Sequence, residues 1–359
     1  SNETPEELDM SETIHCREIQ CEPYDDQRPG TAGLRKKVAV FRQPHYLETF
    51  LEAIFRTIRI APGSTLVVGG DGRYMNREAV PVIAGIAAAH GVGRILTGVD
   101  ARLSTPAASH LIRARQAAGG LLLTASHNPG GPDGDFGLKF NTETGGQAPE
   151  AVTEAVYAAS KTIRSYRRCE LPEMPLSAIG EHDLGDIVLE VVDSTAHYAD
   201  LMESLFDFPR MAEWLERGNR VAFDALHAVT GPYAREIFCR RLGAPETSVL
   251  HGESLPDFGG FHPDPNPVDA AHLVELSQQA DAPALIESGQ QVHPEQHGPE
   301  TVFLASMGRT RAEALFAAKA YSTSFQQVAK KSPTRRRFVA GDAKRIGDPI
   351  NRSTGGHGP

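Results

Sequence analysis

The fold of this chain is decided by residues 65–124, which read TLVVGGDGRYMNREAVPVIAGIAAAHGVGRILTGVDARLSTPAASHLIRARQAAGGLLLT. Three short runs of apolar and β-branched residues within it predict buried strands: TLVV (65–68), RILT (94–97) and LLLT (121–124). Two segments with helically spaced apolar residues that end at glycines predict helices: 77–90 and 105–118. Strands that alternate with helices in this way predict an α/β fold with mixed, mostly parallel sheets sandwiched by helices.

The whole chain divides into four expected segments: a lead-in at 1–24, a first α/β unit at 25–185, a second unit at 186–280 and a tail at 281–359. The second unit repeats the alternating pattern, which predicts strands at 187–192, 220–224 and 248–251 and helices at 195–206, 231–242 and 268–279. The tail loses this periodicity and ends in a stretch rich in Gly, Pro, Asp and Arg. We therefore expect it to be irregular and disordered.

Composition restricts the class of protein. Hydrophobic residues make up 40% of the 359 residues, which is enough for a substantial core. The longest apolar run, residues 80–89, is far shorter than the ~18–20 residues that a membrane span needs. The acidic, polar N-terminus does not resemble a signal or transit peptide. The four cysteines form neither a disulfide framework nor metal-ligand pairs, so we expect a cytoplasmic protein.

Charge is unevenly distributed along the chain. Residues 1–276 contain 25 basic and 39 acidic side chains, whereas residues 277–359 contain 11 basic and 7 acidic ones. An acidic body argues against nucleic acid as a partner, because phosphate backbones select basic surfaces. The basic run at 335–337 is typical of a localisation or nucleic-acid patch, or more commonly of a solvated tail.

The densest polar cluster follows the third predicted strand and reads TASHNPGG at 124–131, then GDFGLKFN at 134–141. It contains neither the Gly-x-Ser-x-Gly of a nucleophile elbow nor the Gly-Lys-Ser/Thr of a P-loop. Ser126 is placed for phosphoryl transfer, Lys139 can balance phosphate charge, and His127 is available for proton transfer. A glycine-rich connecting loop without chemistry is the equally weighted alternative. A shorter cluster, GTAGLR at 30–35, offers the planar guanidinium of Arg35 to a phosphate.

Several motifs occur in a fixed order along the chain: GTAGLR (30–35), VVGGDGR (67–73), TASHNPGG (124–131), GDFGLKFN (134–141), FDALH (223–227), TGPY (230–233) and FGGFHPDPN (258–266). Over residues 25–276 the chain resembles the phosphoglucomutase family of the α-D-phosphohexomutase superfamily. It is most similar to the eukaryotic glucose-type branch with its parafusin-like members. The resemblance implies phosphohexomutase domain I at 25–185 and an incomplete domain II at 186–280.

The resemblance implies a reaction and a set of site residues. Ser126 matches the family's phosphoserine, which interconverts glucose 1-phosphate and glucose 6-phosphate through glucose 1,6-bisphosphate, the activator. His127 and Lys139 match residues that line that site, and Thr31 and Arg35 match a contact to the hexose phosphate substrate. Family members also hold Mg²⁺ between the phosphate on the serine and three aspartates of an Asp-Gly-Asp-Gly-Asp-Arg loop.

The resemblance ends before that metal loop. The corresponding place reads APALIESGQQV at 282–292, where only Glu287 could ligate a metal. The sugar-recognition loop and the fourth domain of the family also have no counterpart. Three explanations compete: a truncated or misread chain with crippled mutase activity, a catalytically inactive parafusin-like protein that binds sugar phosphate or is itself phosphorylated, or a tail that supplies ligands in an unfamiliar way. The abrupt end of the resemblance favours the first.

Overall fold

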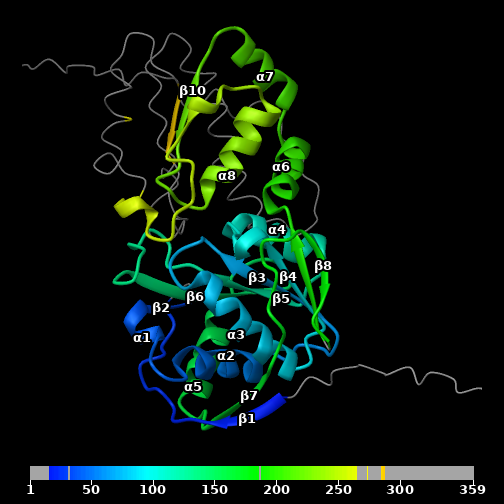
Figure 1. Ribbon diagram of the computed structural model, residues 1–359, viewed down its shortest axis with the longest axis vertical. Coiled ribbons are helices and arrows are strands. Elements are labelled where there is room, and N and C mark those ends of the chain that lie inside the picture. The colour runs from blue at the N-terminus through cyan, green and yellow to red at the C-terminus, as the bar shows by residue number, and fades with distance from the viewer. Residues whose placement is uncertain (1–15, 31–32, 186, 265–272, 274–283, 288–359) are drawn as a thin grey trace, which may run out of the picture.

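The computed structural model describes residues 16–30, 33–185, 187–264, 273 and 284–287 (Figure 1). In these residues the strands form a seven-stranded sheet, a three-stranded parallel sheet and one antiparallel pair. The large sheet lies in the lower half of Figure 1 and the small sheet in the upper half. The expected α/β fold class is confirmed. Within the described ranges, no helix is long and apolar enough to cross a membrane.

The seven-stranded sheet has the order β2-β6-β5-β3-β4-β9-β8. Its strands are β2 (Leu34–Lys37), β3 (Thr65–Gly70), β4 (Arg94–Gly98), β5 (Gly119–Leu123), β6 (Asp135–Thr142), β8 (Gly180–Asp183) and β9 (Val188–Val192). The central strands β5, β3, β4 and β9 are parallel to one another, whereas β2, β6 and β8 pair antiparallel with their neighbours. Because parallel strands end at the same edge, the loops after β3 and β5 come close together.

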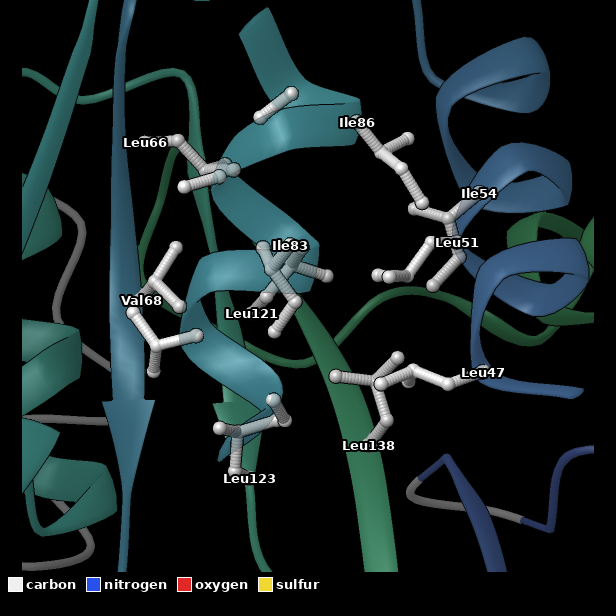
Figure 2. Packing of buried hydrophobic residues seen from close by; sticks show 14 of the residues in the cluster. Leu47, Leu51, Ile54, Leu66, Val68, Ile83, Ile86, Leu121, Leu123 and Leu138 are labelled. Atoms are coloured by element: carbon white, nitrogen blue, oxygen red, sulfur yellow. The ribbon is translucent and has the colours of Figure 1, made fainter. Parts of the chain in front are cut away.

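The helices are α1 (Val38–Phe41), α2 (Tyr46–Thr57), α3 (Asn76–Ala89), α4 (Thr105–Ala114), α5 (Glu150–Ser160), α6 (Ser194–Leu205), α7 (Phe208–Glu216) and α8 (Thr230–Ala234), which continues as a π-helix over Arg235–Arg241. Leu66 and Val68 of β3 pack into the core shared with α2 and α3, whereas Val67 packs with α4 on the other face. Figure 2 shows Ile83 and Ile86 of α3 between the sheet and α2. Burial of both faces accounts for the nearly continuous apolar runs of these strands.

The second unit is built on the sheet β11-β10-β12, formed by β10 (Val221–Asp224), β11 (Val249–Leu250) and β12 (Ala284–Glu287). All three strands are parallel. Its core joins Phe223 of β10 to Tyr198 of α6 and Tyr233 of α8. Helix α4 belongs to both cores, because Ala108 packs into the cluster of the large sheet and Ala107 into that of the second unit. The two units therefore share one helix.

Two expected boundaries are wrong. The strand expected at 187–192 as the first of the second unit forms, but it pairs with β4 and belongs to the large sheet together with β8. Part of the expected lead-in forms β1 (Cys16–Gln20), which pairs antiparallel with β7 (Ser165–Cys169). The first error arises because the pattern of a strand does not carry the identity of its partner, and the second because β1 is not predicted as a strand at all.

Other expectations change as well. Residues 284–287 of the expected tail form β12, since their backbone completes the parallel sheet beside β10. The helix expected at 105–118 ends at Ala114, before a turn into β5. Cys16 and Cys169 form a disulfide, although no disulfide framework is expected, because β1 and β7 place them directly opposite each other. The helix expected at 268–279 and the rest of the tail lie outside the described residues.

Candidate functional site

Ser126 lies in the loop at residues 124–134 that joins β5 to β6, here called the serine loop. Its side chain is 1% exposed, and its backbone has the left-handed φ of 60°, which is uncommon outside glycine. The Ser126 N–H donates to Thr124 Oγ1 at 3.0 Å, which fixes the turn that follows β5. Strained backbone of this kind is concentrated at functional sites, and the loop lies at the carboxyl edge of the parallel strands, where ligands bind in α/β sheets.

A buried arginine holds the serine loop in shape. The guanidinium of Arg73 donates to the carbonyl oxygens of Ser126 at 2.8 Å, Asn128 at 3.4 Å and Asp135 at 2.7 Å. Its Nε contacts both carboxylate oxygens of Asp71, at 3.1 and 3.0 Å. Arg73 is 1% exposed and ties the start of the loop to its end. Only a guanidinium offers this many donors in a fixed plane.

Two further cations, Lys139 and Arg35, lie on the strands next to the serine loop. Lys139, on β6, is 3% exposed, and its pKa falls to about 7 because of burial first and then the positive charge of Arg35. Asp71 raises this pKa and Arg73 lowers it further. The pKa of Arg35 is itself lowered, mainly by burial and next by Arg73. Two buried cations, Lys139 and Arg35, whose pKa values are lowered by burial and by neighbouring positive charge, form an attractive place for a phosphate dianion.

The close approach of β2 to β6 brings Arg35 near Lys139. Arg35 pairs with Gly137 of β6 in the strand register. Gly33, with φ of 114°, lies over Lys139 so closely that a Cβ there would stand 2.9 Å from both Cα and Cγ of the lysine. Only glycine allows this approach. Thr31, the remaining expected substrate contact, lies outside the described residues.

His127 is partly buried, and its ring lies 6.5 Å from the ring of His262 in the second unit, measured between centroids. The structure thus brings four of the five expected site residues to one region: Arg35, Ser126, His127 and Lys139. Sequence reasoning assigned no role to Arg73 or Asp71. Their signal was the DGR of 71–73, which stood among the family motifs and follows β3 at the same sheet edge.

The residues of the described part do not fit the expected Mg²⁺ site. Among them, no group of three or more His, Cys, Asp or Glu side chains could hold a metal ion. Glu287 ends β12 in register with Asp224 of β10, so two acidic residues share the carboxyl edge of the second sheet. Two acidic residues are fewer than the set that the family uses.

The comparisons with known proteins identify the family. The family model for phosphoglucomutase/phosphomannomutase, alpha/beta/alpha domain I, matches residues 26–167. A phosphoglucomutase of Rhizobium radiobacter is 49% identical over 265 residues, which are 74% of this chain and 49% of that protein. Over the matched residues this chain is similar to the phosphohexomutase family. It spans about half the length of the curated relatives it matches, including human phosphoglucomutase-1, which is 46% identical over 274 residues.

A solved structure supports the same assignment. The crystal structure of the exocytosis-sensitive phosphoprotein pp63/parafusin, a phosphoglucomutase from Paramecium in its open form, is 38% identical with a TM-score of 0.74. The match covers 77% of this chain and 53% of that one. A phosphomannomutase structure from Thermus thermophilus is 24% identical with a TM-score of 0.58 and shares the fold. The expected resemblance to phosphoglucomutases is confirmed.

Proposed function

We propose that Ser126 carries a phosphoryl group which this chain exchanges with a hexose phosphate, in the manner of a phosphoglucomutase. The observation that carries the proposal is a buried serine in left-handed backbone whose loop is held by Arg73, with the electrostatically coupled cations Lys139 and Arg35 on the neighbouring strands. The name phosphoglucomutase that the relatives carry supports a glucose phosphate as the substrate, and we take the exchange to run between glucose 1-phosphate and glucose 6-phosphate through glucose 1,6-bisphosphate.

The exchange is one displacement at phosphorus. A hydroxyl oxygen of the hexose monophosphate attacks the phosphorus on Ser126, an O–P bond to the sugar forms, and the Ser126 Oγ–P bond breaks. His127 accepts the proton of the attacking hydroxyl, and Ser126 Oγ leaves with the electron pair of the broken bond and takes up a proton from the Lys139 ammonium. The reverse displacement, from the other phosphate of the bisphosphate, regenerates phosphoserine. Such transfers depend on positioning and on electrostatic stabilisation more than on covalent chemistry.

Lys139 responds to the charge on Ser126. With Ser126 unmodified, burial and Arg35 hold the pKa of Lys139 at about 7, so the amine is partly neutral near that pH. A phosphate dianion on Ser126 raises this pKa, because an opposite charge nearby favours the ammonium. Lys139 is therefore charged when phosphate is present, and it stabilises the negative charge that the transferring group carries.

Mass spectrometry of the intact chain after incubation with glucose 1,6-bisphosphate tests this proposal. We expect one added phosphoryl group, located on Ser126, and none in the Ser126→Ala variant. Ser109→Ala is the matched control, because Ser109 is a buried serine of the same unit whose hydroxyl accepts from Asn141. An unmodified Ser126 in the wild-type chain contradicts the proposal.

The rate of glucose 1-phosphate conversion can be measured separately from phosphorylation of Ser126. We expect conversion of glucose 1-phosphate to be slower than in full-length relatives by at least about a thousandfold, because a catalytic metal ion alone is worth several kcal/mol. The described residues do not assemble its ligands. A rate equal to that of Ser126→Ala, with phosphorylation of Ser126 intact, would favour the alternative.

That alternative is a parafusin-like role in which the chain binds sugar phosphate, or is phosphorylated, without turnover. The missing metal ligands among the described residues favour it. The name of the parafusin structure describes a phosphoprotein sensitive to exocytosis, and that description belongs to the Paramecium protein. Under this alternative, partner association measured by pull-down persists in Ser126→Ala. Loss of association together with loss of phosphorylation would contradict it.

A further inference from the structure

One segment of the second unit lies directly on the serine loop. Residues 254–258, here called the bridging segment, follow β11. The carbonyl oxygen of Pro256 accepts hydrogen bonds from the backbone N–H of Gly131, at 3.2 Å, and of Tyr74, at 2.9 Å. Gly131 belongs to the serine loop, and Tyr74 follows Arg73 in the turn after β3. A single carbonyl therefore connects the two segments that shape the phosphoryl site.

The bridging segment also covers the arginine at the centre of the site. The ring of Phe258 lies over the guanidinium of Arg73, with 5.3 Å from Cζ to the ring centroid, and is 0% exposed. A cation over an aromatic face is attracted by the ring, most strongly where water is excluded. On the other side Gly130 approaches so closely that a Cβ there would stand 2.8 Å from the Phe258 ring and from the Pro256 oxygen.

The bridging segment is anchored in the second unit. The N–H of Leu255 donates to the carbonyl of His227 at 2.9 Å, and the N–H of His227 donates to the carbonyl of His251 at 2.9 Å. His251 Nδ1 lies 3.0 Å from each carboxylate oxygen of buried Asp224, at the end of β10. His227, His251 and Phe258 have φ values of 52°, 45° and 57°, backbone that persists only where surrounding contacts hold it.

We propose that Phe258 is a positioning residue for Ser126 that acts through Arg73, so that the second unit sets the geometry of the first unit's phosphoryl carrier. The expected effect of Phe258 on the rate of Ser126 phosphorylation rests on the proposed function. Without the Phe258 ring, one face of the Arg73 guanidinium is no longer covered, and water can reach it. Its hydrogen bonds to the carbonyls of Ser126 and Asn128 then compete with solvation, and the serine loop takes up more than one arrangement.

The test compares Phe258→Ala, Phe258→Leu and Phe238→Ala in the full chain. Leucine keeps apolar volume without a ring, so it separates cavity effects from the contact with the cation. Phe238 is a buried phenylalanine in the core of the second unit, where it packs on Phe223. Phe238→Ala therefore serves as a control that lowers the free energy of unfolding as Phe258→Ala does. Two readouts are taken: the rate of Ser126 phosphorylation by glucose 1,6-bisphosphate, and hydrogen exchange of the amides of Tyr74 and Gly131.

We expect Phe258→Ala to slow phosphorylation of Ser126 by about tenfold or more and to speed exchange at both amides by a similar factor. Phe258→Leu should fall between Phe258→Ala and the wild-type chain, and Phe238→Ala should leave both readouts near wild type. Unchanged exchange in Phe258→Ala, or equal effects in Phe238→Ala, overturns the inference. If the wild-type chain is not phosphorylated, the proposed function fails, and the exchange measurement still decides the inference about Phe258.

Discussion

Lys139 illustrates how burial prepares a single residue for its chemistry. An exposed lysine has a pKa near 10.5, but here burial lowers the pKa to about 7, with Arg35 as the second cause. The residue lies on β6 between Leu138 and Phe140, in a strand whose neighbours on both sides are paired. The packing around the side chain thus keeps the amine away from water. Such a group responds strongly to any anion that arrives.

This pKa makes stability depend on pH in a defined direction. Below about 7 both the folded and unfolded states hold the proton of Lys139; between about 7 and 10.5 only the unfolded state does, so stability rises with pH. From ~pH 7 to ~pH 9 we expect this residue to add about 2 kcal/mol to the free energy of unfolding. Urea titrations of wild type and Lys139→Met at both pH values measure it. Equal pH dependence in the two proteins would contradict the prediction.

The serine loop depends on glycines where other elements approach it. A Cβ at Gly134 would stand 2.2 Å from the carbonyl oxygen of Gly130, and one at Gly137 would stand 2.3 Å from that of Thr124. The backbone of the loop therefore packs against itself and against the bridging segment without intervening side chains. This packing brings several carbonyl oxygens within reach of one guanidinium.

Gly130→Ala tests this packing at the level of the loop. The added methyl group meets the Phe258 ring and the Pro256 oxygen, so we expect the loop to move and the free energy of unfolding to fall by about 1–3 kcal/mol. Phosphorylation of Ser126 should slow in parallel. Gly146→Ala is the control, because a Cβ there meets only Thr144 Oγ1 at 3.4 Å. Thermal and urea unfolding of both variants measure the difference, and similar losses would refute the explanation.

At the scale of the molecule, the two units are joined through buried polar contacts as well as through α4. The hydroxyl of Tyr233 in the second unit donates to Ser194 Oγ at 3.0 Å and accepts from the backbone N–H of Ser104 at 3.2 Å. Ser104 caps the N-terminus of α4, where its own Oγ accepts from the N–H of Ala107. One phenol thus links the cap of the shared helix to the start of α6.

Tyr233→Phe should weaken this connection. The change leaves the buried N–H of Ser104 without its acceptor, and such a loss costs about 1–3 kcal/mol. We expect the free energy of unfolding to fall by that amount, with the second unit opening first in hydrogen exchange. Tyr157→Phe serves as the control, because the Tyr157 hydroxyl makes an exposed contact with the Asp25 carbonyl. A stability loss in Tyr157→Phe as large as that in Tyr233→Phe would show that the buried hydrogen bond contributes no more to the free energy of unfolding than the exposed one.

The central strands, the helices between them and the position of Ser126 could all be predicted from local sequence patterns. The runs at 65–68, 94–97 and 121–124 are apolar on both faces, so only a buried strand in a layered sheet suits them. The polar loop after the third run then had to lie at the carboxyl edge. Local pattern is enough for these conclusions, because burial and periodicity act on neighbouring residues.

Strand pairing, the role of Arg73 and the contact between Phe258 and the serine loop could not be predicted in this way. Strand β9 reads like any other strand, yet its partner is β4, far back in the chain. The low pKa of Lys139 depends on Arg35 and on burial, neither of which a local pattern records. Pairing, burial and charge coupling join residues distant in sequence, so they exist only once the chain has folded.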